Sequence, residues 1–271
     1  FQGGAGDDQF SVDAVAAGTI SGGSGTDFLR ISRSGSSVGE VIQVDGLSGG
    51  SFTLSGGTVV SGIEQLQFVG GSGNDRVTFT NILAAATSFN GGGGTDRVTA
   101  DYSNFSTPIY LTLANTNWFR AAFNGGTGDH IVDMYNVEEF DITGGSGNDI
   151  FDANGAAWVS FQGGAGDDQF SVDAVAAGTI SGGSGTDFLR ISRSGSTTNE
   201  VVQIDGLTAG SFTLSDGAVI SGIERIDFTG GSGNDRATFT NVNAMENTFN
   251  GGSGTDRAII SYSGFDTPIY L

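Results

Sequence analysis

The sequence has 271 residues, with 48 Gly, only 2 Pro, and a formal net charge of -20 from 30 acidic and 10 basic residues. This acidity disfavours nucleic acid and anionic membrane surfaces as partners, because both would repel the protein. The hydrophobic fraction of 37% and the 20 Phe exclude a disordered chain. There is no Cys, so a large core or bound metal has to stabilise the chain in place of disulfides.

A long internal repeat organises the chain. Residues 1–36 recur without change at 161–196, and the similarity continues to the last residue. We therefore predict two units, a first copy at 1–160 and a partial second copy at 161–271. Such duplication is typical of a tandem array in which neighbouring repeats pack on one another.

No stretch of 18 apolar residues occurs, so we expect no membrane span.

A shorter motif, Gly-Gly-x-Gly-x-Asp, recurs inside each unit. It begins at Gly3, Gly22, Gly70, Gly91, Gly125, Gly144, Gly163, Gly182, Gly230 and Gly251, and only the fifth motif has its acid one place early, at Asp129. An apolar residue stands two places before each motif and another seven places after its first Gly. Around them apolar and polar residues alternate, which predicts a strand, a tight Gly turn and a second strand.

The spacing of the motifs predicts how the strands stack. Successive motifs in the first unit start 19, 48, 21, 34, 19 and 19 residues apart. A spacing of 19 to 21 residues fits one coil, so we predict an all-β parallel solenoid (a β-helix or β-roll) with the turns stacked along one edge. The two longer spacings are expected to hold coils without the motif, or excursions from the coil.

The turns have the composition of a calcium site. Gly allows main-chain conformations in which carbonyl oxygens turn inward, and each Asp adds a carboxylate. Calcium takes six to eight oxygen ligands, more than one short turn supplies but within reach of two stacked turns. We therefore expect one ion per stacked pair, about six in all. A simpler interpretation is that each Asp only hydrogen-bonds its own Gly turn.

Segments such as GGAGDDQFS (3–11) and GGSGNDRVT (70–78) resemble the RTX (repeats-in-toxin, hemolysin-type) nonapeptide Gly-Gly-x-Gly-x-Asp-x-U-x, in which U is a large apolar residue. In that family the repeat is a calcium-binding β-helix. RTX repeats usually follow one another head to tail, whereas no two motifs here lie nine residues apart. The resemblance implies calcium binding, secretion by a type I system and folding on calcium outside the cell.

On the basis of the turns and the resemblance, we predict metal ligands in every motif: the first Gly, the third residue and the acid. These are Gly3, Ala5, Asp8, Gly22, Ser24, Asp27, Gly70, Ser72, Asp75, Gly91, Gly93, Asp96, Gly125, Thr127, Asp129, Gly144, Ser146, Asp149, Gly163, Ala165, Asp168, Gly182, Ser184, Asp187, Gly230, Ser232, Asp235, Gly251, Ser253 and Asp256. Glu64, Glu138 and Glu224 each stand six places before a motif. For these three we favour an ion pair or a turn contact over a metal ligand.

The function expected from the sequence is a calcium-binding structural or adhesive module of a large secreted or cell-surface protein, an adhesin. We do not expect an enzyme, because the chain has one His and no recognisable nucleophile motif. The alternative is part of a polysaccharide-modifying parallel β-helix enzyme of the epimerase or lyase type. A surface glycan is the further partner considered.

Overall fold

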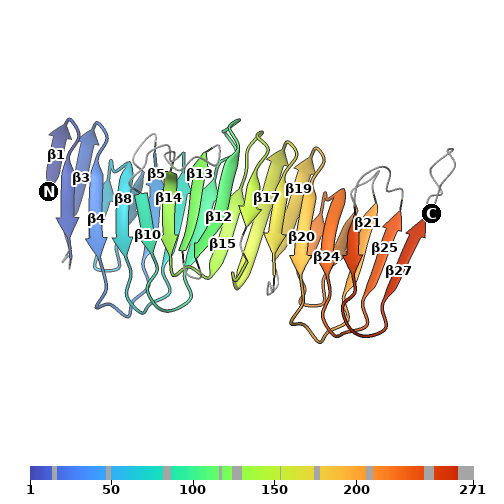
Figure 1. Ribbon diagram of the computed structural model, residues 1–271. Helices are drawn as coiled ribbons and strands as arrows, with labels where there is room; N and C mark the ends of the chain where they lie inside the picture. The colour runs from blue at the N-terminus through green and yellow to red at the C-terminus, as the bar shows by residue number, and fades with distance from the viewer. Residues whose placement is uncertain are drawn as a thin grey trace.

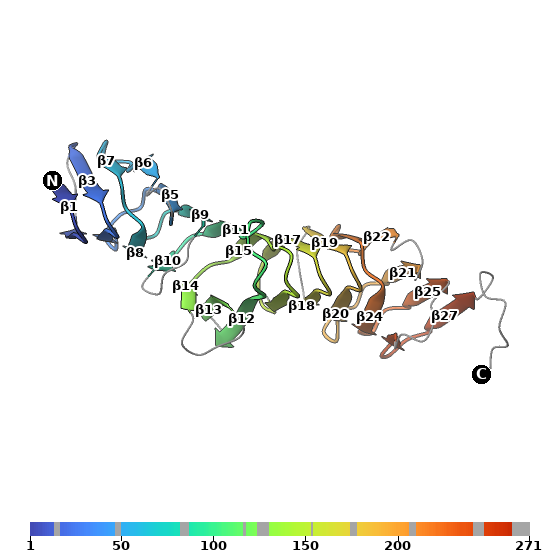
Figure 2. The same ribbon diagram turned by 90° about the horizontal axis from the view of Figure 1, so that it is seen from above.

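The structure is a computed structural model that describes residues 1–13, 17–46, 50–81, 87–115, 118–123, 130–152, 154–173, 178–205, 210–240 and 247–261. The described residues form 27 β-strands and no helix. The protein is all-β, and most of its strand pairs are parallel, as predicted. The strands lie in two layers, side by side along an elongated molecule with β1 and β27 at opposite ends (Figures 1 and 2).

One layer is a single twelve-stranded sheet. Its strands, in spatial order, are β2 (Gln9–Val12), β4 (Phe28–Ser32), β8 (Gln65–Val69), β10 (Thr87–Asn90), β14 (His130–Tyr135), β13 (Trp118–Phe123), β12 (Ile109–Asn115), β16 (Ile150–Asp152), β18 (Gln169–Val172), β20 (Phe188–Ser192), β24 (Arg225–Thr229) and β26 (Thr248–Asn250). All neighbours in it are parallel except at β13, which is antiparallel to both β12 and β14.

The second layer consists of three sheets. The four-stranded sheet contains β1 (Gln2–Ala5), β3 (Thr19–Ser24), β7 (Val59–Ser61) and β6 (Ser51–Thr53). The eight-stranded sheet contains β22 (Ser211–Thr213), β23 (Val219–Ser221), β19 (Thr179–Ser184), β17 (Trp158–Ala165), β15 (Glu139–Thr143), β11 (Arg97–Asp101), β9 (Arg76–Thr80) and β5 (Val41–Asp45). The three-stranded sheet contains β21 (Val201–Asp205), β25 (Arg236–Thr240) and β27 (Arg257–Ser261).

The chain crosses from one layer to the other, and most strands pair with the strand reached one circuit later. In the twelve-stranded sheet, for example, Phe170 of β18 is opposite Leu189 of β20. Alternate side chains point between the layers, as the period-2 pattern predicts. Aromatic rings stack there from circuit to circuit, with centroids 5.4 Å apart for Phe68 and Phe89 and 5.5 Å apart for Phe151 and Phe170.

The two long motif spacings contain extra strands. In the 48-residue spacing, β5 is followed by the antiparallel hairpin β6–β7, and β5 pairs with β9 while β7 pairs with β3. The second copy repeats this arrangement with β21, β22 and β23. In the other long spacing, β12 and β13 are inserted into the twelve-stranded sheet. Both spacings therefore contain excursions from the regular circuit.

These excursions place the motif turns on two edges of the molecule. We call the corners that lead into the twelve-stranded sheet the entry edge and those that lead out of it the exit edge. Motifs 3–8, 22–27, 144–149, 163–168 and 182–187 lie on the entry edge, whereas 70–75, 91–96, 230–235 and 251–256 lie on the exit edge. The prediction of a single edge is therefore wrong. Each excursion shifts the chain by half a circuit relative to the regular coil. The next described motif therefore connects the layers in the opposite direction and lies on the opposite edge.

Candidate metal centres

The closing Asp residues form columns along the two edges. Within each stacked pair of turns, the main-chain N–H of one Asp donates to Oδ1 of the Asp in the next circuit. This bond is 2.8 Å for Asp8 to Asp27, 2.7 Å for Asp75 to Asp96, 2.7 Å for Asp149 to Asp168, 2.8 Å for Asp168 to Asp187 and 2.8 Å for Asp235 to Asp256. The carboxylates thus hold neighbouring circuits together, which the simpler interpretation of an Asp bonded only to its own turn did not predict.

Glu residues end three of these columns. Oε2 of Glu64, Glu138 and Glu224 accepts the main-chain N–H of Asp27, Asp96 and Asp187 at 2.8, 2.9 and 2.7 Å. In the circuit that follows the last motif of each of these three columns, a Glu side chain therefore accepts the hydrogen bond that an Asp side chain accepts in the other circuits. This is a turn contact, one of the two roles favoured from the sequence.

Oδ2 of these Asp side chains is the feature that points to a ligand. In seven of them, Oδ2 is buried and has no hydrogen-bond partner: Asp8, Asp27, Asp75, Asp96, Asp168, Asp187 and Asp235. Asp149 differs, because its Oδ2 accepts the main-chain N–H of Gly145 at 3.0 Å. A buried carboxylate oxygen without a donor is unfavourable unless a proton or a cation neutralises it.

The first Gly of each motif makes room for this oxygen. A Cβ added at Gly163 would lie 2.1 Å from Oδ2 of Asp168 and 2.5 Å from the carbonyl oxygen of Gly182 in the next circuit. Such contacts exclude any side chain at this position. The same geometry brings a carboxylate oxygen and a carbonyl oxygen close together, so that both acceptors face one small space.

Burial also shifts the titration of the Asp columns. Burial, together with the nearby carboxylates of Asp149, Asp187 and Asp167, raises the pKa of Asp168 to about 7. Burial raises the pKa to about 6 for Asp96, Asp149 and Asp187. These carboxyl groups are therefore costly to ionise unless a cation lies beside them.

The structure separates the predicted ligands into two kinds. The first Gly and the acid of each described motif lie together at a corner. The carbonyl oxygens of the third residues Ser24 and Ser184 accept the N–H of Gly6 and Gly166 at 2.8 and 2.9 Å, so one lone pair of each is already used. Gly125, Thr127 and Asp129 lie outside the described residues.

Side chains alone do not complete a metal site in the described part of the chain. No group of three or more His, Cys, Asp or Glu side chains has metal-binding geometry there. A cation at a corner would therefore need main-chain carbonyl oxygens beside the unpaired Oδ2, as calcium sites allow. The residues present fit this requirement through a carboxylate and a carbonyl from successive circuits.

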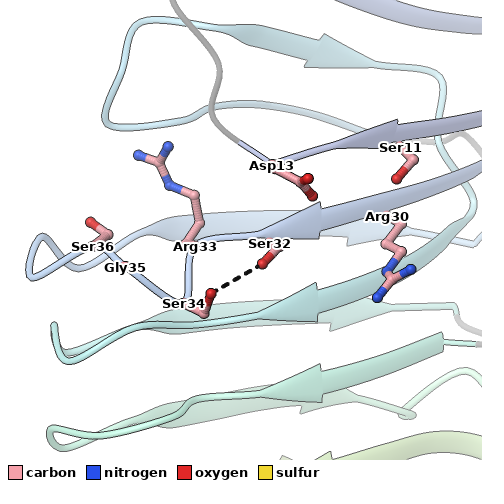
Figure 3. A pocket seen from close by; sticks show the side chains of 8 residues that line it. All are labelled: Ser11, Asp13, Arg30, Ser32, Arg33, Ser34, Gly35 and Ser36. Carbon is pink, nitrogen blue, oxygen red and sulfur yellow. Dashed lines mark hydrogen bonds between the residues drawn. The ribbon is translucent and has the colours of Figure 1, made fainter.

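A polar groove lies on the outer face of the twelve-stranded sheet, apart from the motif corners. It has a volume of about 690 Å³ in the first copy and is lined by Ser11, Asp13, Arg30, Ser32, Arg33, Ser34, Gly35 and Ser36 (Figure 3). A hollow of about 550 Å³ lies at the corresponding turn of the second copy. Its Asp173 and Ser192–Ser196 correspond to lining residues of the first groove, it is lined in addition by Thr198, Glu200, Ser215 and Asp216, and it is not lined by Arg190. Side chains from two neighbouring strands and the turn that follows them form its walls.

A buried ion pair supports this groove and joins it to the exit edge. In the first copy Nε of Arg33 donates to Oε1 of Glu40 at 2.7 Å, and the N–H of Ser55 donates to Oε2 at 2.6 Å. The main-chain N–H of Glu40 in turn donates to Oδ1 of Asp75 at 2.7 Å. The sequence reasoning missed Glu40, although an acid directly after the Ser-rich turn recurs in both copies.

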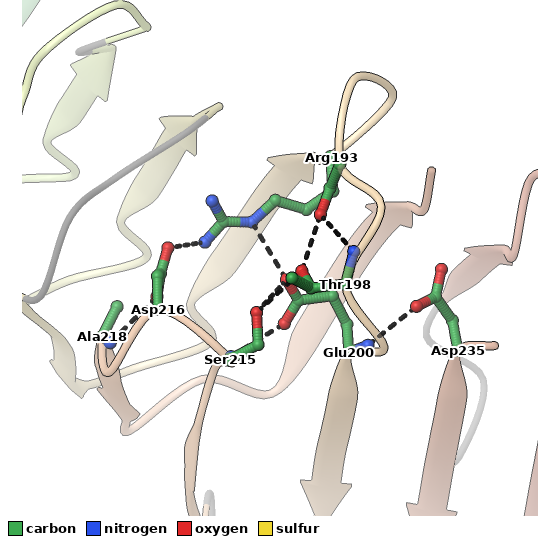
Figure 4. A network of polar contacts seen from close by, with 8 residues as sticks. Arg193, Thr198, Glu200, Ser215, Asp216, Ala218 and Asp235 are labelled. Carbon is green, nitrogen blue, oxygen red and sulfur yellow. Dashed lines mark hydrogen bonds and ion pairs between the residues drawn. The ribbon is translucent and has the colours of Figure 1, made fainter. Parts of the chain in front are cut away.

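The second copy has the same arrangement with one addition. Arg193 pairs with Asp216, which stands where the first copy has Gly56, and Glu200 binds Ser215 and the corner Asp235 (Figure 4). Arg193 is 7% exposed and Glu200 is 2% exposed. This network anchors the start of the hairpin excursion to the motif turn of the following circuit.

A comparison with known protein families finds no match, and a comparison with curated proteins finds no similar sequence. Among the described residues, no helix has the length and apolar character needed to cross a membrane.

Proposed function

We propose that this chain is a calcium-binding β-solenoid module of the RTX type, with a structural or adhesive role in a large secreted or cell-surface protein. The observation that carries this proposal is the set of seven buried Oδ2 atoms without a partner, all at Gly-Gly-x-Gly-x-Asp corners. The net charge of -20 supports the same role, because multivalent cations are the partners that such a chain attracts.

Calcium has a direct energetic role in this proposal. Without it, successive carboxylates stack about 4.8 Å apart along each edge and repel one another. With it, a Ca²⁺ ion between two circuits neutralises the carboxylates and occupies the space beside Oδ2. Because the ion binds the folded chain and not the unfolded one, it stabilises the fold, and folding follows export to a calcium-rich medium.

The number of ions follows from the stacked pairs on both edges. The described pairs are 3/22, 144/163 and 163/182 on the entry edge, and 70/91 and 230/251 on the exit edge. We propose one ion for each of these pairs. The sixth predicted pair, 125/144, includes a motif outside the described residues.

The proposed module is not an enzyme. The epimerase or lyase alternative needs a catalytic base with cationic side chains around a substrate groove. The two polar grooves are lined mainly by Ser, Asp and Arg, and the Arg beside the buried Glu in each, Arg33 or Arg193, is already paired with that Glu. These observations favour binding over chemistry.

A calcium titration tests the proposal. Purified protein is stripped with EGTA, and circular dichroism and thermal unfolding are followed as Ca²⁺ is added, with equal Mg²⁺ as the control. We expect Ca²⁺ to raise the Tm and the strand signal and Mg²⁺ to do neither, with the bound ions counted by native mass spectrometry. An unchanged Tm after exhaustive EGTA treatment would contradict the proposal.

A further inference from the structure

The polar groove defined above recurs at equivalent places in the two copies. All eight residues that line it in the first copy fall within residues 1–36, which are identical to 161–196, and the identity ends at its last lining residue, Ser36. Immediately beyond, Ser37, Val38 and Gly39 are replaced by Thr197, Thr198 and Asn199. Asp173, Ser192, Ser194 and Ser196 from this identical stretch also line the second groove, whose remaining wall includes Thr198 and Asp216.

The chemistry of the groove suits a hydroxyl-rich ligand. Ser11, Ser32 and Ser34 offer hydroxyl groups, and Asp13 offers a carboxylate that accepts hydrogen bonds (Figure 3). Arg30 is exposed and makes no ion pair within the described part of the chain, so its planar guanidinium group is free to donate.

The groove is also held in place by groups behind it. The buried Arg33–Glu40 pair fixes one wall in the first copy, and Arg193, Glu200 and Asp216 fix it in the second (Figure 4). A wall held by such a network needs little reorganisation on binding, which favours affinity. The volumes of about 690 and 550 Å³ lie in the usual range for small-molecule sites.

The two grooves open on one sheet. β2–β4 and β18–β20 belong to the twelve-stranded sheet, and β18 is eight strand positions from β2. With about 4.8 Å between neighbouring strands, the grooves repeat about every 38 Å along the molecule. A linear polymer lying along this face would meet both grooves, whereas a short oligomer would meet one.

We propose that these grooves are repeated binding sites for a neutral polysaccharide. The protein's charge of -20 disfavours a polyanionic glycan. The first groove offers Asp13 and the exposed Arg30 to uncharged hydroxyl groups, and the second offers Asp173 beside Ser and Thr hydroxyls. This deepens the adhesive role proposed above and rests on it, with Asp13, Arg30 and Ser32 as polar contacts in the first groove and Asp173, Ser192 and Ser194 in the second. Occupancy of both grooves by one chain gives avidity.

The test is affinity gel electrophoresis in saturating calcium, with dextran, laminarin and galactomannan as neutral probes and alginate as the polyanion. We expect at least one neutral probe to retard the protein. The double variant Arg30→Ala/Ser192→Ala, with one lining residue changed in each groove, should lose about tenfold or more in affinity, and each single variant should keep single-site binding without avidity. The control Arg76→Ala, an exposed Arg on the other layer, should leave retardation unchanged.

A second pair of variants distinguishes loss of glycan binding from loss of the folded structure. Ser34→Trp and Ser194→Trp fill the grooves at exposed turn positions and should abolish retardation with an unchanged calcium-dependent Tm. Retardation by alginate alone, by no probe, or equally in the blocked variant would overturn the proposal. Because calcium is fixed and the Tm is measured in parallel, failure of glycan binding is distinct from failure of the calcium proposal.

Discussion

The main-chain N–H of Asp168 donates a hydrogen bond of 2.8 Å to Oδ1 of Asp187, one circuit further along the chain. The same Asp168 accepts a bond on its own Oδ1 from the N–H of Asp149. Asp168 and Asp187 thus each have one oxygen that joins circuits and a second oxygen, Oδ2, that is buried without a partner. This division lets the hydrogen bonds and the charge at a corner be tested separately.

Asp168→Asn separates these two roles. The amide keeps an oxygen for the N–H of Asp149 and removes the buried charge, so in EGTA we expect equal or higher stability, by up to about 1 kcal/mol. In calcium the same variant should lose much of the stabilisation by the ion. Asp7→Asn is the control, because Asp7 is exposed, carries the same charge and lies outside the column that contains Asp168. Urea unfolding with and without calcium measures both effects, and equal behaviour of the two variants would contradict the metal role.

The buried Asp residues also predict how stability depends on pH. The pKa of Asp168 is about 7 in the folded protein, whereas that of an unfolded Asp is about 3.9. The folded state therefore holds a proton that the unfolded state releases, and stability in EGTA should fall as the pH rises from about 4 to about 7.

Urea midpoints across this pH range, measured in EGTA, test the prediction. Asp168→Asn should flatten the curve, and Asp7→Asn, at an exposed Asp of the first copy, should leave its slope close to that of the parent protein. Addition of calcium at pH 7 should restore stability, because the ion replaces the proton. Stability that rises with pH in EGTA would show that these carboxyl groups are not held in a protonated form.

Gly163 predicts the cost of filling a corner. Its added Cβ would meet Oδ2 of Asp168 at 2.1 Å, so Gly163→Ala should destabilise the protein by about 3 kcal/mol and weaken calcium binding. Gly195→Ala is a matched control, since nothing lies within 4 Å of an added Cβ there. Thermal unfolding of both variants tests this prediction. Similar Tm values for Gly163→Ala and Gly195→Ala would mean that the corner accommodates the added methyl group at little cost.

Glu64 is expected to act through its hydrogen bond rather than through a metal. Glu64→Ala leaves the N–H of Asp27 without its acceptor and should cost about 1–3 kcal/mol. Glu64→Gln keeps an acceptor oxygen and should cost much less. Calorimetry at several calcium concentrations checks this, because a shared loss of ion stoichiometry in both variants would instead make Glu64 a ligand.

Much of the local structure could be predicted from the sequence. The alternation around Phe68 and Val77 marks strands whose apolar faces are buried, and both side chains are at most 1% exposed. The Gly-Gly-x-Gly-x-Asp spacing marks the turns between them. These features depend on backbone sterics and side-chain periodicity within a few residues, so short segments of the sequence are enough to predict them.

Other features depend on contacts between distant segments and are visible only in the tertiary structure. The hairpin β6–β7 and the inserted strands β12 and β13 change how often the chain crosses between layers, and this crossing number decides which edge receives each turn. Likewise, Glu40 is 35 residues from the Asp75 that accepts its N–H. The sequence by itself determined the repeat, the strands and the acidic turns. The tertiary structure decided that the turns occupy two edges and that Oδ2 points inward, because both depend on which circuits become neighbours.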